Sequence, residues 1–431
     1  MQSIPARALL LAALITANCA RFRAEPSVAT IPGVSALRFA ALVDGTGELT
    51  PDAIVFVAGD TIVRVASGDA ALPPGIPVTD LRPLTAIPGM IDAHTHMTYW
   101  RDKANDPMGQ RAPRSRDSIV MMAAENARRT LETGVTTVRD LGAANYNDIA
   151  MRDSINKGAM TGPRMFVSGF GLSKFGGGGR GGPALPGRGQ VRDTNDLLPA
   201  ITAQVEAGAD WIKMYGSTGS FQNVTGRQTF TNAEMRVAVA TAHKLGKRIA
   251  IHSYGDSGGR AAMQAGAESV EHPAGVDDIT LVAWARTNTF YVPTVDHNRF
   301  YAENAALLRY NAQQVAALDS FRALNLETVR RAAKAGVKIA MGSDAVYWMH
   351  GENTTELRRF IEAGMTPAQA LETATVNGGA LLGMPKKLGR VARGFYADIV
   401  AVDGNPLTDI EVVIRRVKWV MKGGKVVVDK R

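Results

Sequence analysis

The sequence predicts an α/β protein: a (β/α)8 barrel, or TIM barrel, with a small β-sandwich domain built from both chain ends. From residue 86 onward, short apolar runs alternate with helical patterns, which gives about eight strand–helix units over roughly 300 residues. The stretches before and after this region contain strand patterns instead. At 431 residues, the chain can bury a large core and hold more than one domain.

The strand candidates are apolar runs, and several follow a helical pattern that ends in glycine. Gly134, Gly208, Gly266 and Gly336 stand at such junctions, where glycine is a common helix stop. The strand candidates are 86–91, 136–139, 164–167, 211–214, 248–251, 269–270, 290–293 and 338–341. The helical patterns include 118–133, 195–207, 232–245, 258–265 and 324–335. An open doubly wound sheet is the alternative fold, but no Gly-rich phosphate fingerprint follows the first strand.

Strand patterns occupy both ends of the chain. Runs 53–57 and 61–65 flank Ala58-Gly59-Asp60, which is typical of a β-hairpin. Further strands are expected at 36–45, 397–402, 417–422 and 425–428. The predicted domains are the first part of the β-sandwich (31–85), the barrel (86–385) and the second part of the sandwich (386–431).

The first residues have the pattern of an export signal. Arg7 is followed by an apolar run, 8–17, that is too short to span a bilayer. We therefore expect residues 1–24 to be a signal peptide and the protein to be periplasmic or secreted. Cys19, the single cysteine, excludes a disulfide within the chain. It lies in a stretch similar to a lipoprotein processing site, so a lipid anchor through Cys19 is the alternative. No later run predicts a transmembrane segment.

Much of the excess in the formal charge of +9 lies in residues 101–116 and 415–431. A nucleic-acid partner is not expected, because no recognisable binding module accompanies these charges. A solvated basic surface is the simplest interpretation, while attraction to anionic lipid or to an acidic substrate stays open.

The central motif is the stretch 88–96, in which an apolar run ends in His94-Thr95-His96. Residues two apart in an extended segment lie on the same face, so both imidazoles can reach one point. Such a pair suits a divalent transition metal. By itself, His-x-His is a weak signal.

Four further residues stand at or near the ends of later strand candidates: Lys213, His252, His272 and Asp344. Each has a more ordinary explanation by itself, such as a hydrogen-bonded core histidine, a paired lysine or a turn. In a (β/α)8 barrel, however, the carboxyl ends of all strands meet at one face. The convergence of these side chains with the two histidines predicts a site there.

On these motifs the sequence resembles the amidohydrolase superfamily of metal-dependent hydrolases. The resemblance covers most of the chain after the signal. Its motifs are 88–96, 133–140, Trp211-Ile212-Lys213, His252, Glu271-His272, Gly342-Ser343-Asp344 and the tail 394–407. Within the superfamily, the chain is most similar to the branch of Xaa-Pro dipeptidases, Lys/Arg dipeptidase-carboxypeptidases and ochratoxin-type amidases.

The resemblance implies two divalent metal ions and a CO₂ adduct on Lys213. An ammonium group has no lone pair, so only the carboxylated lysine can bridge the metals. His94, His96 and Asp344 would hold one metal; His252 and His272 would hold the other. Zinc is the expected metal, with manganese, cobalt and iron left open.

The resemblance also implies catalytic roles. A hydroxide that bridges the metals would attack the carbonyl, and Asp344 would pass its proton to the leaving amine. A tyrosine at the place of Tyr254 helps to hold the carbonyl or a terminal carboxylate, with simple packing as the alternative. His297 either lines the pocket or is an ordinary loop histidine. His243 and His350 receive no role.

We therefore expect a homo-oligomeric enzyme that cleaves the amide bond of a dipeptide or N-acyl amino acid. The alternatives are a hydrolase of carbamates, ureas or amide toxins on the same site, and a non-catalytic binding or scaffold relative. The complete ligand set counts against a non-catalytic relative, and Lys213 counts against a deaminase. The Gly-rich segment 169–189 is either a lid or a surface loop. It lacks the Gly-Gly-His type segment of related peptidases, which weakens the assignment of a peptide substrate. The insertion 101–116 is either a solvated loop or attracts a carboxylate-bearing substrate.

Overall fold

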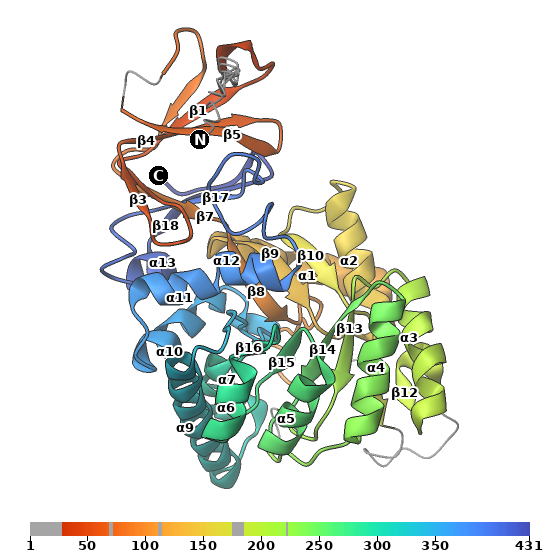
Figure 1. Cartoon of the computed structure of the whole chain (residues 1–431). Coiled ribbons are helices and arrows are strands. Elements are labelled where there is room, and N and C mark those ends of the chain that lie inside the picture. Colours follow the sequence, from red (N-terminus) through yellow and green to blue (C-terminus); the bar gives the residue numbers. More distant parts are fainter. Residues whose placement is uncertain (1–27, 69–71, 111–113, 175–184, 221–222) are drawn as a thin grey trace, which may run out of the picture.

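The computed structural model describes residues 28–68, 72–110, 114–174, 185–220 and 223–431. The predicted signal peptide with Cys19, and most of the glycines in 169–189, lie outside these residues. The molecule is a mixed α/β structure (Figure 1). Strands from both chain ends gather at one end of it, and the alternating strands and helices make up the rest.

The chain ends form two sheets that share one apolar cluster, which includes Leu37, Val55, Ala86 and Trp419. The first sheet has the order β5-β4-β1-β6. Its strands are β1 (Ser35–Arg38), β4 (Ala53–Ala58), β5 (Thr61–Ser67) and β6 (Val78–Asp80). The second has the order β19-β18-β17-β7-β2-β3. Its strands are β2 (Ala41–Val43), β3 (Leu49–Pro51), β7 (Thr85–Pro88), β17 (Ile399–Val402), β18 (Val417–Lys422) and β19 (Lys425–Asp429).

The predicted hairpin is confirmed, because β4 and β5 pair antiparallel. The prediction of one strand within 36–45 is wrong. The backbone changes sheets after Arg38: the amide of Phe39 donates to Ala53 in the first sheet, and that of Ala40 donates to Leu84 beside the second.

The parallel strands of the second region form two hydrogen-bonded groups. The first is β8 (Met90–Thr95), β9 (Val135–Asp140) and β10 (Arg164–Val167). The second is β13 (Trp211–Tyr215), β14 (Arg248–His252), β15 (Ser269–Glu271) and β16 (Phe290–Val292). Seven of the eight predicted strands therefore contribute a regular parallel strand to these groups.

Backbone hydrogen bonds also link the two groups. The amide of Asp210 donates to Val167 at 2.8 Å, and that of Leu172 donates to Lys213 at 2.7 Å. On the other side, segment 338–341 lies between β16 and β8. Tyr291 donates to Lys338 at 2.8 Å, and Ala93 donates to Met341 at 2.8 Å. The predicted strand 338–341 is thus an isolated bridge through Ile339 rather than a regular strand.

The predicted strand 86–91 is divided at Gly89 between the two regions. β7 before the glycine pairs with β17, and β8 after it pairs with β9. A Cβ atom on Gly89 would lie 2.1 Å from Oγ1 of Thr136, so only glycine allows this close crossing. Apolarity continues through both strands, and for this reason the break was not evident from the sequence.

Helices cover the outside of the parallel strands (Figure 1). Their bounds are α1 (Arg116–Glu132), α2 (Asn147–Asn156), α3 (Leu197–Glu206), α4 (Asn232–Lys244), α5 (Asp256–Ala265), α6 (Asp278–Trp284), α7 (Val295–Glu303), α8 (Ala305–Leu308), α9 (Ala312–Ala335), α10 (Glu356–Glu362), α11 (Pro367–Thr373), α12 (Val376–Leu381) and α13 (Glu411–Arg415).

Local sequence signals fix several of these helix ends. Thr231 and Glu234 form a capping box at the start of α4, and Gly266 ends α5 with φ +84°. The helix predicted at 324–335 is the second half of α9, which begins at a capping box on Asn311. No helix within the described ranges is long and apolar enough to cross a membrane.

Candidate active site

One cavity lies where the parallel strands end. It is lined by every residue for which the sequence predicted a metal-binding or catalytic role: His94, His96, Lys213, His252, Tyr254, His272 and Asp344. His297 and four further tyrosines, Tyr99, Tyr215, Tyr301 and Tyr347, also line it. Side chains up to 250 positions apart in the sequence thus line the same cavity.

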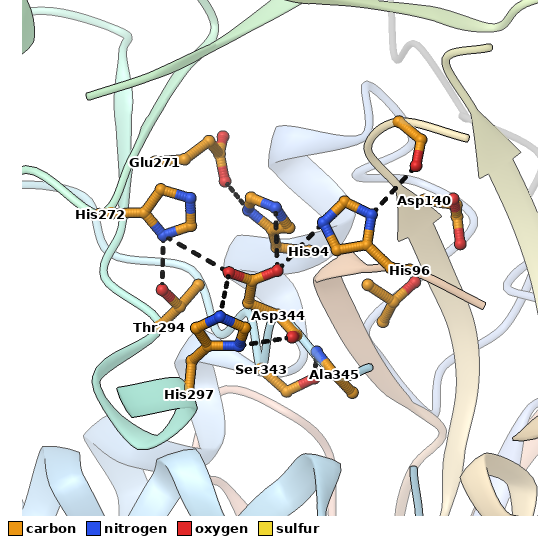
Figure 2. Close-up of polar contacts among 12 residues, drawn as sticks. His94, His96, Asp140, Glu271, His272, Thr294, His297, Ser343, Asp344 and Ala345 are labelled. Carbon is orange, nitrogen blue, oxygen red and sulfur yellow. Dashed lines mark hydrogen bonds and ion pairs between the residues drawn. The ribbon is translucent and has the colours of Figure 1, made fainter. Parts of the chain in front are cut away.

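His94, His96 and Asp344 come closest together, each with one potential ligand atom within 4.8 Å of the others. The Nε2 atom of His96 lies 3.1 Å from Oδ1 of Asp344, and that of His94 lies 3.6 Å from the same oxygen. His94 is in β8 and His96 follows its last residue, so the strand pleat points both rings the same way. The structure therefore brings this predicted ligand trio together (Figure 2).

Hydrogen bonds to Nδ1 of His94 and His96 determine which nitrogen of each ring can bind a metal. The Nδ1 of His96 donates to the carbonyl oxygen of Gly142 at 3.1 Å, and that of His94 donates to Oε2 of Glu271 at 2.8 Å. A neutral imidazole then keeps its lone pair on Nε2, which faces Asp344. Burial, followed by the charge of Lys213, lowers the pKa of His94 to about 4, so this ring is neutral at pH 7.

A buried ion pair holds Glu271 in place beneath the cavity. Its Oε1 accepts from the guanidinium of Arg139 at 3.0 Å, and both side chains have no exposed surface. Arg139 also donates to the backbone oxygen of Ala93 at 2.6 Å and lies over the Trp211 ring at 4.4 Å. The same arginine therefore fixes the backbone beside His94 and the carboxylate that orients its ring.

His252 and His272 form the second predicted pair, with ring centroids 4.8 Å apart. Within the described part of the chain, Nε2 of His252 is buried without a hydrogen-bond partner. A buried polar atom is normally satisfied, so this nitrogen is a candidate metal ligand. Burial and the charge of Lys213 lower the pKa of His252 to about 3, so the ring is neutral at pH 7 and one of its nitrogens has a free lone pair.

Lys213 is 1% exposed and extends into the cavity from β13. No hydrogen bond or ion pair to its ammonium group is found among the described residues. Burial lowers its pKa to about 8, although the charges of Glu271 and Asp344 oppose the shift. A buried, unpaired ammonium is costly, and an amine with this pKa is partly neutral at pH 7. Both properties favour reaction of the amine with CO₂.

The carboxylate of Asp344 lies at the centre of the site. Four histidine rings surround it, with nitrogen–oxygen distances of 3.6 Å for His94, 3.1 Å for His96, 4.0 Å for His272 and 3.3 Å for His297 (Figure 2). Asp344 and His272 have left-handed backbone φ angles of +53° and +71°. Such conformations are uncommon for non-glycine residues and cluster at functional sites.

His297, which the sequence left open, belongs to the site. It lies in the first turn of α7, where its Nδ1 donates to the backbone oxygen of Asp344 at 2.7 Å. Its Nε2 lies 3.3 Å from the carboxylate of the same residue. No spacing rule predicts this contact, because His297 follows its strand through the turn at Pro293 and Thr294.

Another buried carboxylate, Asp92, was not singled out in the sequence. It accepts from the amide of Ser343 at 2.9 Å, from the Ser343 hydroxyl at 2.5 Å and from Asn353 at 2.9 Å. These bonds join the strand of His94 to the turn of Asp344. The sequence could have indicated a role for Asp92, because this residue lies within the central motif 88–96.

The remaining predictions concern Tyr254, which was assigned to the site, and two histidines, which were not. Tyr254 is buried and stacks on the His252 ring at 5.0 Å and on the Phe321 ring at 4.5 Å. His243 and His350, which received no role, are not among the cavity-lining residues. His243 pairs with Glu268 at the surface, and His350 is buried behind the His96 backbone.

The model of the amidohydrolase family matches residues 85–427. The chain belongs to this family. Ochratoxinase from Aspergillus niger is 28% identical to this amidohydrolase over 89% of the chain and 84% of the relative. The amidohydrolase is therefore an enzyme that acts on amide C–N bonds. Members of the family depend on metals, and the trio of His94, His96 and Asp344 is a suitable metal-binding cluster.

Solved structures agree with this membership. A Xaa-Pro dipeptidase with bound methionine superposes with a TM-score of 0.83 and 29% identity, over 91% of this amidohydrolase and 99% of that chain. A prolidase complexed with N-methylphosphonate-L-proline has a TM-score of 0.81 and 28% identity, over 92% and 100% of the two chains. The A. niger ochratoxinase structure has a TM-score of 0.78 and 26% identity, over 92% and 96%.

Proposed function

We propose that this amidohydrolase uses two divalent metal ions to hydrolyse the amide bond of a dipeptide or an N-acyl amino acid. One observation carries the proposal: six potential ligands from five separate segments of the chain line a single cavity, with His94 and His96 both at the end of β8. The named relatives include an ochratoxinase and a Xaa-Pro dipeptidase, which support an amide bond next to an amino acid.

The residues present fit a metal pair. His94, His96 and Asp344 would hold one ion, and His252 and His272 the other, with carboxylated Lys213 between them. Within the described residues, Nε2 of His252 and the amine of Lys213 have no hydrogen-bond partner, which supports this assignment. Imidazole and carboxylate donors favour zinc. When bound, such a metal pair lowers the pKa of a coordinated water towards about 7 and polarises the scissile carbonyl.

Asp344 is placed to move the proton of the reaction. Its carboxylate accepts a proton from the attacking water and returns it to the leaving amine. The Nδ1–H of His297 is donated to a carbonyl, so the lone pair on Nε2 faces Oδ2 of Asp344 at 3.3 Å. A proton taken up on Oδ2 can therefore be held between these two atoms until the amine leaves.

The tyrosines provide the walls of the substrate pocket. The side chains of Tyr254 and Tyr347 are buried, and each places an aromatic surface against the cavity. These walls exclude water and favour an apolar substituent on the substrate. The Tyr254 ring stacks on the His252 ring at 5.0 Å, and its phenol would donate a hydrogen bond to the substrate.

We further propose that the parallel strands close into the (β/α)8 barrel predicted from the sequence. The hydrogen bonds at Asp210, Leu172, Tyr291 and Ala93 support closure, since they continue the pairing between the strand groups. The apolar cluster shared by the two chain-end sheets supports a β-sandwich made from residues 31–85 and 386–431. Export directed by residues 1–24 and a homo-oligomeric state remain proposals from the sequence.

Metal removal tests the proposal. Protein treated with a chelator is expected to lose at least about 100-fold in turnover of N-acyl amino acids, because ligation and carbonyl polarisation are lost together. Added Zn²⁺, Mn²⁺ or Co²⁺ together with bicarbonate should restore it. The measurement is metal content against rate over a panel of N-acyl amino acids, dipeptides, carbamates and ureas. Full activity of the metal-free protein would refute the proposal, and faster hydrolysis of the ureas would favour the alternative substrates.

Replacing Glu271 tests how the first metal ligand is oriented. Glu271→Gln is expected to weaken metal binding by about 10- to 100-fold, because the carboxylate that fixes the His94 tautomer is lost. Competition with a chromogenic chelator measures the affinity. Glu268→Gln is the matched control, since Glu268 pairs with His243 at 2.9 Å on the surface. Equal affinities in the two variants would contradict a role for Glu271 in holding His94.

A further inference from the structure

The cavity needs a group that recognises the rest of the substrate. Its formally charged lining residues are Lys213 and Asp344, and both are already engaged in the proposed metal chemistry. The tyrosines of its wall carry no charge at neutral pH. A charged group that recognises the substrate without taking part in that chemistry would therefore lie just outside the lining.

Arg101 is placed at this position, in the loop that follows β8. Its guanidinium carbon lies 3.8 Å from the centroid of the Tyr347 ring, and Tyr347 lines the cavity. The Nη1 atom of Arg101 donates to the carbonyl oxygen of Pro107 at 3.1 Å, which anchors the side chain. The guanidinium is thus held against a ring that lines the pocket, and Arg101 is half-buried.

The aromatic platform under Arg101 is itself fixed. The amide of Tyr347 donates to the carbonyl of Tyr99, another cavity residue, at 2.7 Å. Tyr347 has a left-handed φ of +50°, an uncommon conformation for a bulky residue. Burial raises the pKa of Tyr347, Arg101 opposes the shift, and Asp344 adds to it. The Tyr347 hydroxyl is therefore within electrostatic reach of both the catalytic carboxylate and the arginine.

Arg101 forms no ion pair with a carboxylate of the described residues. By contrast, Arg299 in α7 pairs with Asp296, Glu303 and Glu352. A guanidinium held in place, with donors left over, is suited to a carboxylate ligand. In an N-acyl amino acid, the carboxylate is separated from the scissile carbonyl by the amide nitrogen and the Cα atom.

We propose that Arg101 binds the free carboxylate of the substrate, so that the enzyme prefers N-acyl amino acids or dipeptides over neutral amides. This inference rests on the proposed function and deepens it. It also assigns a role to part of the basic stretch 101–116, which the sequence left between a solvated loop and an attraction for anionic substrates.

The test compares each substrate as a free acid and as its primary carboxamide. The wild-type enzyme is expected to prefer the acid. Arg101→Gln should lower kcat/KM for the acid by about 10- to 100-fold, mainly through KM, and change the value for the carboxamide less than about threefold. Arg101→Lys should recover part of the loss. Lys103→Gln is the matched control, because Lys103 lies 5.6 Å over Trp348, which does not line the cavity.

An equal loss for acid and carboxamide in Arg101→Gln, or no loss for either, would overturn the assignment. If the wild type hydrolyses neither form, the proposed function fails. In that case, the affinity of the metal-loaded protein for N-acetyl-L-phenylalanine, measured by calorimetry, tests separately whether Arg101 binds a carboxylate. Weaker binding to Arg101→Gln than to wild type would support the subsite, and equal binding would overturn it.

Discussion

Asp344→Asn is expected to reduce kcat by about 10²- to 10⁴-fold and to leave the protein folded. The amide has the shape of the carboxylate and keeps hydrogen-bonding atoms towards His96 and His297, but it cannot accept the proton of the attacking water. The measurements are kcat with an N-acyl amino acid, bound metal per chain, and the thermal unfolding midpoint.

The control for this variant is Asp278→Asn, which alters an exposed carboxylate paired with Arg331 at 2.8 Å. Its kcat should match that of the wild type. A near-normal kcat for Asp344→Asn with metal bound would remove Asp344 from the proton-transfer role. Loss of metal with a normal unfolding midpoint would show that its role as a ligand dominates.

Lys213→Met is expected to lower both metal content and kcat/KM. Removal of a hydrogen-bond partner of a metal ligand typically costs roughly 10- to 100-fold in metal affinity or activity. The loss in Lys213→Met should be larger, because the proposed bridge itself is removed. Methionine has a similar length and no amine, so it cannot form a carbamate. The protein should be as stable as the wild type or more so, since the buried amine is replaced by an apolar group.

A labelling experiment tests this account of Lys213 directly. Wild-type protein loaded with metal and ¹³C-bicarbonate should give a carbamate carbon signal in its NMR spectrum, and Lys213→Met should not. Hydrolysis at wild-type rates by Lys213→Met would exclude the bridge. The same signal in both proteins would place the carbamate on another lysine.

The parts of the structure that follow from short-range pattern could be read from the sequence. His94 and His96 are two residues apart in a strand, and the pleat alone requires that they face one point. Lys213, His252 and His272 stand at or next to the ends of apolar runs in the sequence. Parallel strands present these ends at one face, so no long-range information was needed.

The contacts that could not be read depend on tertiary packing. The ion pair between Arg139 and Glu271 joins residues 132 positions apart, and neither residue type is expected in a core. His297 reaches Asp344 because α7 begins immediately after a turn at Thr294, whose φ is +51°. The division at Gly89 depends on the approach of Thr136 and is hidden by continuous apolarity.

Anomalous diffraction from crystals grown with zinc and bicarbonate tests the central claim most directly. The account predicts two peaks in the cavity, one next to His94, His96 and Asp344 and one next to His252 and His272, with density for a carbamate on Lys213 between them. A cavity without anomalous signal in an enzyme that still cleaves amides, or zinc bound to residues elsewhere, would contradict it.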